Sequence, residues 1–247
     1  MIDDDLLLRF IDAFVGYGNV AAPYWFIGME EGGDSSHASL MNRVTVWRDR
    51  GARAVEDLRD YHLATRLSAF LLPGARLQPT WKQLIRITLL AQGQPVTPQT
   101  MLAYQAHQLG RMGGETALFE LYPLPATSLN HWPYASLSTL PMLRDRKTYR
   151  AALTDQRCRL LGELIDTHRP RVVIMYGATY RNLWARIAGP LQDIVAPAGI
   201  AIGLRGASRM LAIQHPGAWG ATDAYFDAVG RYVHESCVRV PLPFPPT

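Results

Sequence analysis

Two adjacent glutamates, Glu30 and Glu31, follow an apolar run in the segment YWFIGMEEGGD at 24–34, and glycines flank the pair on both sides. A carboxylate can act as a general base or offset a neighbouring positive charge, and general-base assistance contributes about 10²–10⁴ in rate. Far along the chain, His215 ends another apolar run, and its ring N–H can stabilise a developing anion. Paired glutamates in a loop are often only solvated, and a single histidine is often structural. These residues form a candidate site only if the fold brings them together.

Four short runs are nearly continuous in hydrophobicity, as strands buried on both faces are. They are YWFIG at 24–28, ALFELY at 117–122, RVVIMYG at 171–177 and RMLAIQH at 209–215. Three helical patterns lie between or after these runs. They predict a helix that begins at Thr97 with Pro98 in its first turn and ends near 110–114, a helix over about 146–168, and a helix over 221–234.

Strands that alternate with helices indicate an α/β fold. We expect a doubly wound, mainly parallel four-stranded sheet with helices on both faces. A single domain is expected over 1–247, with its core at about 20–235 and a proline-rich tail at 238–247. In such sheets, ligands bind outside the carboxyl ends of the strands, where the strand order reverses. Because Glu30, Glu31 and His215 all follow strands, this rule places them at one edge of the sheet.

The composition indicates a globular chain whose charge permits a nucleic-acid partner without requiring one. Hydrophobic residues make up 48% of the chain and charged residues 19%, and no apolar stretch is long enough for a membrane span. The acidic start MIDDDLLLRF lacks the basic region of a secretory signal, so we expect a cytoplasmic protein with no membrane partner. The pI is about 9.2, and all but two of the 25 basic residues are arginine. Arginine suits a polyanion partner, but a GC-rich genome produces the same bias.

The sequence gives no reason to expect a cofactor or a metal. The two cysteines, Cys158 and Cys237, match no zinc or iron–sulfur spacing and are too few for a disulfide scaffold. Neither a Gly-x-Gly-x-x-Gly fingerprint nor a phosphate loop with lysine occurs, and no His/Asp/Glu spacing suggests a zinc site.

The order of these segments resembles the uracil-DNA glycosylase superfamily, in a branch without an iron–sulfur cluster. GMEEGG at 28–33 stands where the family has Gly-Gln-Asp-Pro-Tyr-His or a related motif, and HPGAWG at 215–220 matches its late His-Pro-Ser-Pro-Leu-Ser. The resemblance covers the chain from residue 24 to about residue 234. It implies a DNA glycosylase of base-excision repair that removes uracil, or a related damaged base, from single- or double-stranded DNA. We also expect a monomer that needs no cofactor.

The resemblance assigns catalytic roles to three residues. Hydrolysis of the N-glycosidic bond develops positive charge on the sugar and negative charge on the departing base. By position, His215 would donate a hydrogen bond to the base, and Glu30 would orient the water and offset the cationic sugar. Glu31 replaces the family's usual proline and is the substitute if Glu30 points away.

Several further positions would contact the base. Gly28 and Met29 belong to the first motif. Gly32 takes the place of a tyrosine that excludes the thymine methyl group in one branch, which implies a roomier pocket. Trp47 is the nearest large aromatic residue on which a base could stack, although its apolar neighbours fit a buried helix equally well.

The position that reads the edge of uracil departs from the family. In several branches an asparagine on the second strand makes paired hydrogen bonds to the base, and the nearest match here is Glu120. An ionised carboxylate only accepts hydrogen bonds, so it would meet the N3–H of uracil but not its O4. Asn130 is the alternative.

The same resemblance suggests DNA contacts. Trp219 stands where the family often inserts a leucine into the duplex, and Gly217 belongs to the same loop. Trp219 would fit the core equally well. Arg43 and Arg48 belong to an arginine cluster that could bind phosphates, although a solvated helix face is the commoner fate of such charges.

Two other functions fit the same residues. One is a catalytically weak or inactive protein of this fold that binds nucleic acid or a free base, because Met29, Glu31 and Glu120 depart from the family pattern. The other is an unrelated α/β hydrolase that acts on a small substrate with the paired glutamates as acid and base. The Gly-x-Ser-x-Gly nucleophile motif of esterases is absent.

Overall fold

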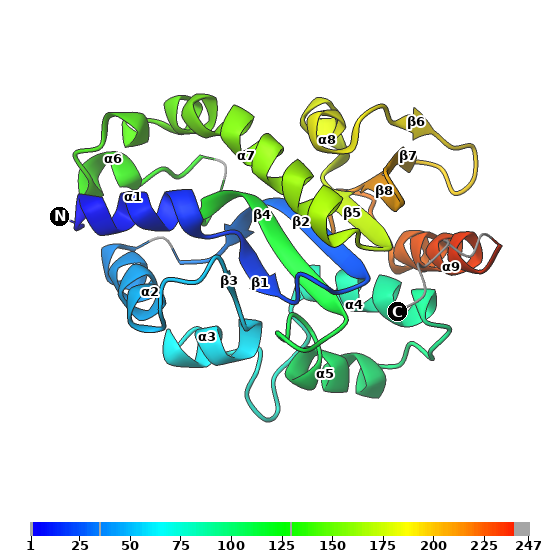
Figure 1. Cartoon of the computed structure of the whole chain (residues 1–247). Helices are drawn as coiled ribbons and strands as arrows, with labels where there is room; N and C mark the ends of the chain where they lie inside the picture. Colours follow the sequence, from blue (N-terminus) through cyan, green and yellow to red (C-terminus); the bar gives the residue numbers. More distant parts are fainter. Residues whose placement is uncertain (1, 35, 129, 240–247) are drawn as a thin grey trace.

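The computed structural model describes residues 2–34, 36–128 and 130–239, and its strands form one eight-stranded mixed sheet in the order β3-β1-β4-β2-β5-β8-β7-β6 (Figure 1). The strands are β1 (Gly16–Gly18), β2 (Tyr24–Gly32), β3 (Val55–Glu56), β4 (Thr116–Ala126), β5 (Val172–Tyr176), β6 (Gln192–Asp193), β7 (Ala201–Arg205) and β8 (Ser208–Ile213). The expected proline-rich tail lies, from residue 240 onward, outside the described residues.

The four predicted strands are the centre of this sheet. They correspond to β2, β4, β5 and β8, and each neighbouring pair among them is parallel. The predicted α/β class is therefore confirmed, but the predicted total of four strands is wrong. β1 and β3 extend one side of the sheet. On the other side β7 pairs antiparallel with β8, and β6 pairs antiparallel with β7. Three of these added strands have only two or three residues, too few for a hydrophobic period to appear in the sequence.

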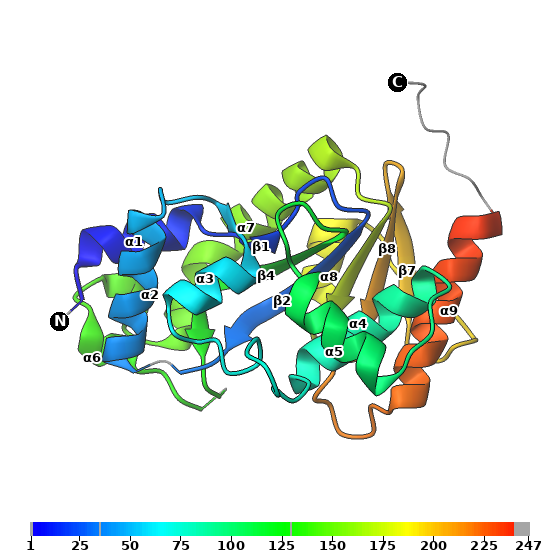
Figure 2. The same cartoon turned by 90° about the horizontal axis from the view of Figure 1, so that it is seen from below.

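Helices cover both faces, as predicted for a doubly wound sheet. α7 and α8 lie on one face, and α4, α5 and α9 lie on the other (Figure 2). The helices are α1 (Asp4–Ala13), α2 (His37–Asp49), α3 (Leu58–Ala64), α4 (Pro79–Ala91), α5 (Pro98–His107), α6 (Tyr134–Leu137), α7 (Arg146–His168), α8 (Arg181–Ala188) and α9 (Asp223–Arg239), with short 3₁₀ turns η1 (Pro141–Leu143) and η2 (Ala178–Tyr180). Within the described residues, no helix combines the length and the apolar character that a membrane crossing requires.

The ends predicted from the sequence for α5 and α7 are found in the structure to within a few residues. Thr97 caps α5 in a reciprocal capping box with Thr100, and Pro98 stands in the first turn as predicted. α5 ends at His107, a few residues before the predicted end. α7 spans 146–168 as predicted, capped by Asp145 at its start and by Arg169 in the left-handed conformation at its end.

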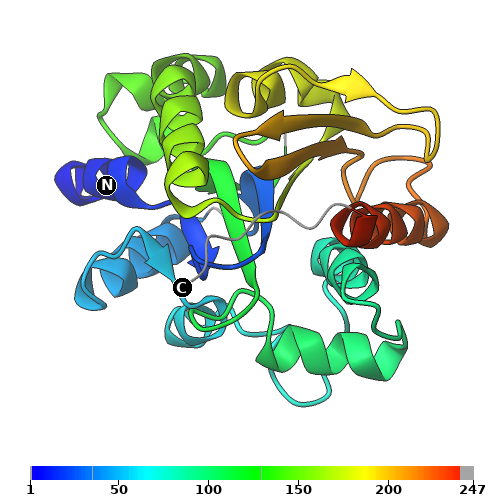
Figure 3. The same cartoon turned by 45° about the vertical axis from the view of Figure 1, so that its right-hand side comes forward.

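α9 packs against α4 on the face of the sheet opposite to α7 and α8, and the two helices lie side by side in Figure 3. A Cβ atom at Gly230 of α9 would stand 2.7 Å from Cβ of Leu90, so the close approach of the two helices requires glycine there. Ion pairs of Arg86 with Asp223 and Asp227 bridge the same interface.

The strand order reverses beside β2. From β2 the chain crosses to β4 on one side and then returns to β5 on the other. The carboxyl ends of β2, β4, β5 and β8 point the same way because these strands are parallel. In open α/β sheets ligands bind at this switch point, outside the carboxyl ends of the strands. The candidate site is therefore at the carboxyl ends of β2 and its two neighbours, β4 and β5.

Candidate functional site

At the carboxyl end of β2, the adjacent glutamates turn toward different helices. Glu30 pairs with two arginines of α7: Nη2 of Arg150 lies 2.9 Å from its Oε1, and Nη1 of Arg146 binds the same oxygen. Arg146 also donates to the backbone carbonyls of Ser128 and His131, which fixes the guanidinium in place. The other carboxylate oxygen of Glu30, Oε2, is buried and has no hydrogen-bond partner among the described residues.

The carboxylate of Glu31 contacts three polar side chains from the N-terminal half of the chain. Its carboxylate binds Nη1 of the buried Arg43 at 2.7 Å and accepts a hydrogen bond from Tyr17 at 2.8 Å, and Nε2 of His62 lies 3.5 Å away. Burial alone would raise the pKa of Glu31, but Arg43 and His62 outweigh it and hold that pKa well below its usual range. This arrangement ties β2 to α2 and α3.

These partners bear on two expectations. Both oxygens of Glu31 have partners, so the structure favours Glu30 over Glu31 as the catalytic carboxylate, and the substitute role of Glu31 stays a prediction. Glu30 and Glu31 pair with groups of different helices, which counts against an unrelated hydrolase that would use both on one small substrate.

A third carboxyl group reaches the same region from β4. Glu120 is in register with Gly28 of β2, and Tyr176 ends β5 on the other side of β2. The hydroxyl of Tyr176 donates to Oε1 of Glu120 at 3.1 Å, so the two side chains meet over Gly28. A Cβ atom at Gly28 would collide with the Tyr176 hydroxyl and with Oε2 of Glu120. Glycine is therefore what allows contact across the middle strand.

The surroundings of Glu120 favour its uncharged form. Burial has the largest effect in raising the pKa of Glu120 well above its usual value, and the negative charges of Glu31 and Glu30 act in the same direction. The hydrogen bond from Tyr176 and the charge of Arg157 oppose this rise without cancelling it. Arg157 itself donates to the backbone carbonyls of Leu121 and Glu120 rather than to the carboxyl group.

His215 follows the end of β8, and its ring packs against Tyr176 with the ring centroids 5.6 Å apart. Nδ1 of His215 accepts a hydrogen bond from the backbone N–H of Gly217 at 2.9 Å. In the neutral ring this leaves the proton on Nε2, which is therefore a donor. Partial burial lowers the pKa of His215, so the neutral ring is favoured at neutral pH.

Glu30 and His215 thus lie at the same edge of the sheet. They follow β2 and β8, which both neighbour β5, so two strand spacings of about 4.8 Å separate the two strands. Tyr176 lies at the end of the intervening strand. The expectation that Glu30 and His215 share an edge is confirmed; whether they line one cavity stays a prediction.

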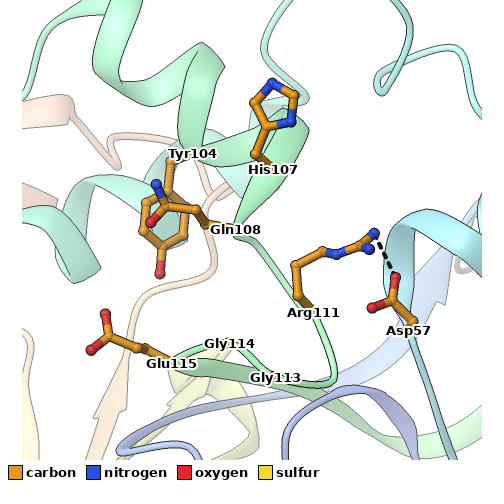
Figure 4. Close-up of a pocket in the computed structure, with 8 residues that line it drawn as sticks. All are labelled: Asp57, Tyr104, His107, Gln108, Arg111, Gly113, Gly114 and Glu115. Carbon is orange, nitrogen blue, oxygen red and sulfur yellow. Dashed lines mark ion pairs between the residues drawn. The ribbon is translucent and has the colours of Figure 1, made fainter.

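Two cavities among the described residues lie elsewhere. One, of about 400 Å³, is lined by Tyr104, Arg111 and Glu115 near the amino end of β4, opposite to the end that carries Glu30 (Figure 4). Its Arg111 pairs with Asp57 at 2.7 Å, as the dashed line in Figure 4 marks. The other, of about 340 Å³, lies beside Arg205. Neither contains a predicted site residue.

Two of the predicted contact residues belong to the core. Trp47 is 1% exposed, donates its ring N–H to the carbonyl of Arg53 and packs edge to face on Phe10. It offers no face to a base, so its predicted stacking role is wrong. Arg43 is 2% exposed and paired with Glu31, so it cannot meet phosphate as predicted.

The remaining predicted residues lie nearer the surface, except Met29, which is buried in the core. Gly32, Asn130 and Gly217 are exposed, and Arg48 is exposed and paired with Asp49. Trp219 is fully exposed, so the alternative in which it packs inside the core is wrong. Its insertion into DNA stays a prediction.

Sequence reasoning missed the residues that orient these groups. Tyr176 carried a signal, because it stands near the end of the predicted strand 171–177, just before a predicted edge loop. Arg146 and Arg150 stand four residues apart on a predicted helix, a spacing that puts both on one face. Tyr17 and His62 carried no sequence signal, because neither lies in a recognised motif.

No group of three or more histidine, cysteine, aspartate or glutamate side chains suited to a metal ion occurs among the described residues. The sequence was also compared with known proteins. It matches no protein-family model, and it matches no curated protein.

Proposed function

We propose that this chain is a cofactor-independent DNA glycosylase that hydrolyses the N-glycosidic bond of uracil or a related base. The observation that carries the proposal is the placement of Glu30 and His215 at the ends of two parallel strands that flank β5. An acidic group and a neutral imidazole donor on either side of one strand end suit a bond whose two halves develop opposite charges. The order of the two motifs along the chain supports the same reading.

In the proposed reaction, the bond between C1′ and the base nitrogen breaks and its electron pair stays on the base. His215 donates from Nε2–H to the carbonyl oxygen of the base, where negative charge collects. Water forms the new bond to C1′, and its proton passes toward Oε2 of Glu30, which has no hydrogen-bond partner among the described residues. Because two arginines bind Oε1, the main contribution of Glu30 is to orient the water and to offset the cationic sugar.

A cleavage assay tests this proposal. Labelled single- and double-stranded DNA containing uracil is incubated with the protein and then heated in alkali to break the abasic sites. Wild-type protein should produce cleavage, and His215→Ala should reduce the rate by about 10²–10³, the usual effect of losing one donor to a developing anion. Glu30→Gln should reduce the rate by a similar factor.

His107→Ala is the matched control. His107 is exposed at the end of α5, beside the cavity at the opposite end of the sheet, so its loss should leave the cleavage rate unchanged. Absence of abasic sites with every uracil-containing DNA, or full activity in His215→Ala, would contradict the proposal.

The second candidate is a protein that binds nucleic acid or a base without catalysis. The ion pairs of Glu30 with Arg146 and Arg150 favour it, because they offset the negative charge that would otherwise face the cationic sugar. This candidate predicts DNA binding that weakens steeply with salt and no abasic sites at any protein concentration.

A further inference from the structure

The end of β8, just before His215, is held by a tyrosine of α9 rather than by a neighbouring strand. β7 and β8 pair antiparallel, and extension of their register by two residues would pair Gly199 with Gln214. Instead, the hydroxyl of Tyr225 stands between these two backbones. It accepts a hydrogen bond from the N–H of Gln214 at 3.1 Å and donates one to the carbonyl of Gly199 at 2.9 Å. The hydroxyl therefore takes the place of a direct bond in the sheet ladder.

The inserted hydroxyl sets the separation between the ends of β7 and β8. A direct backbone bond brings nitrogen and oxygen to about 2.9 Å, and a bridging oxygen keeps them farther apart. Gly199 fits this place because its φ is +79° and a Cβ atom there would lie 3.1 Å from the side-chain nitrogen of Gln214. Loss of the hydroxyl would leave one backbone donor and one backbone acceptor without this partner, so the strand ends would rearrange.

Tyr225 can hold the strand end in place because the first turn of α9 is anchored on α4. The carboxylate of Asp223 accepts hydrogen bonds from Lys82 at 2.8 Å and from Gln83 at 2.8 Å. It also pairs with Arg86 at 2.8 Å. The hydroxyl of Tyr225 therefore ties the end of β8 to the packed pair of helices α4 and α9.

Hydrogen bonds within its own loop fix His215 only relative to that loop. The carbonyl of His215 accepts from the N–H of Ala218 at 2.8 Å, and its Nδ1 accepts from the N–H of Gly217. Both donors follow His215 closely in the chain, so they move with it. The direction in which the loop leaves the sheet depends on how the preceding residue, Gln214, is held.

We propose that Tyr225 is a positioning residue for His215: its hydroxyl, inserted between β7 and β8, sets the direction in which the end of β8 holds the imidazole against Tyr176. This inference rests on the proposed function, in which His215 donates to the departing base. Tyr225 acts through His215 and contacts no reacting atom. The position of the imidazole matters because a catalytic group misplaced by about 1 Å can cost about 10²-fold in rate.

NMR of the full chain without DNA tests the positioning directly, with Tyr225→Phe, which removes the hydroxyl and keeps the ring. The rings of His215 and Tyr176 have centroids 5.6 Å apart, so their protons should give a nuclear Overhauser effect in wild type. In Tyr225→Phe this effect should weaken, because the end of β8 is no longer held at the same distance from β7. Tyr232→Phe is the matched control, at a half-buried tyrosine about two turns further along α9, and should leave the effect unchanged. An unchanged effect in Tyr225→Phe would overturn the proposal.

Kinetics of cleavage of uracil-containing DNA test the consequence. The kcat of Tyr225→Phe should fall by about 10- to 100-fold with KM nearly unchanged, because the substrate still binds while the donor to the base is misdirected. Tyr232→Phe should keep the wild-type kcat and KM. A higher KM at unchanged kcat in Tyr225→Phe would mean that the hydroxyl supports substrate binding instead, and would overturn the positioning role.

The two proposals fail in different ways. If Tyr225→Phe weakens the contact between the two rings but wild type cleaves no DNA, the glycosylase proposal is wrong and the positioning of His215 by Tyr225 stands. If DNA is cleaved and Tyr225→Phe keeps the wild-type kcat, the positioning role is wrong and the glycosylase proposal stands. Circular dichroism checks that each variant is folded. If Tyr225→Phe does not fold, Gly199→Ala, whose Cβ atom presses on Gln214 from the other side of the bridge, should weaken the same Overhauser effect, and no change there would overturn the proposal.

Discussion

Gly28 and Tyr176 lie on neighbouring strands, and the hydroxyl of Tyr176 occupies the place that a side chain at position 28 would take. Because of this relationship, a residue of β5 can reach Glu120 of β4 across the strand between them. The polar groups on three strands thereby form one continuous arrangement, which His215 joins through its contact with the Tyr176 ring.

Gly28→Ala should disrupt that arrangement. The new Cβ atom would collide with the Tyr176 hydroxyl and with Oε2 of Glu120, so one of them must move. Overpacking of this kind costs about 1–3 kcal/mol in the free energy of unfolding. Urea denaturation measures the loss. Gly33→Ala is the matched control, because a Cβ atom there meets no atom within 4 Å and should change stability by less than about 0.5 kcal/mol. Equal effects of the two substitutions would contradict the packing described here.

Arg43→Ala should be among the most damaging arginine substitutions. It removes the partner of Glu31 and leaves the carboxylate inside the protein, which costs about 3–5 kcal/mol when one member of a buried pair is lost. Arg48→Ala, in the same helix, removes an exposed, solvent-screened pair with Asp49 and should leave the free energy of unfolding nearly unchanged. Chemical denaturation of both variants compares them, and a cost for Arg43→Ala as small as that for Arg48→Ala would mean that the buried pair does not form.

Glu31 should make the protein sensitive to acid. Its folded-state pKa lies below the usual value of 4.5, so below pH 4.5 the unfolded chain binds more protons than the native chain. The contribution of Glu31 is therefore fully present above pH 4.5 and is lost as the pH falls toward its folded-state pKa. In Glu31→Gln, the fall of stability with pH should be shallower by up to about 1.4 kcal/mol per pH unit. Denaturation curves at several acidic pH values measure this slope, and Glu163→Gln, on the exposed side of α7, should keep the wild-type slope.

Glu120 should have the opposite effect on the alkaline side. Its folded-state pKa lies above the usual value of 4.5, so between these two values the native chain holds one proton more than the unfolded chain. Stability should therefore fall as the pH rises through that interval, by up to about 1.4 kcal/mol per pH unit. Glu120→Gln removes this slope, so its stability relative to wild type should improve with rising pH. The same denaturation series detects it, and parallel curves for wild type and Glu120→Gln would show that Glu120 does not titrate in this way.

Trp219→Ala should weaken DNA binding without changing the stability of the fold. The side chain is fully exposed, so its removal should change the free energy of unfolding by less than about 0.5 kcal/mol. If it stacks between bases, affinity for uracil-containing DNA should fall by about 1–3 kcal/mol per lost stacking contact. Fluorescence anisotropy with labelled DNA measures this affinity. Val195→Ala, an exposed apolar residue between β6 and β7, should leave DNA affinity unchanged, and an equal loss in both variants would contradict a specific role for Trp219.

The sequence was sufficient for the elements whose signals are local and repeated. The four buried strands show as continuous apolar runs, and α7 shows both its start and its end through residues at its own termini. Parallel order then follows from the alternation of strands and helices, and with it the placement of Glu30 and His215 at one edge. The short edge strands have no such signal, because their pairing depends on the sheet they join.

What the sequence alone determined about this protein is which residues stand at strand ends; the tertiary structure alone decided what each of them can do. Glu30 and Glu31 are neighbours with identical side chains, yet among the described residues one has an oxygen without a partner and the other is enclosed by Arg43 and Tyr17. Glu120 differs from both because no arginine in the described part of the chain pairs with its carboxyl group. Charge state and reactivity depend on partners brought close by folding, and a linear pattern carries no record of those distances.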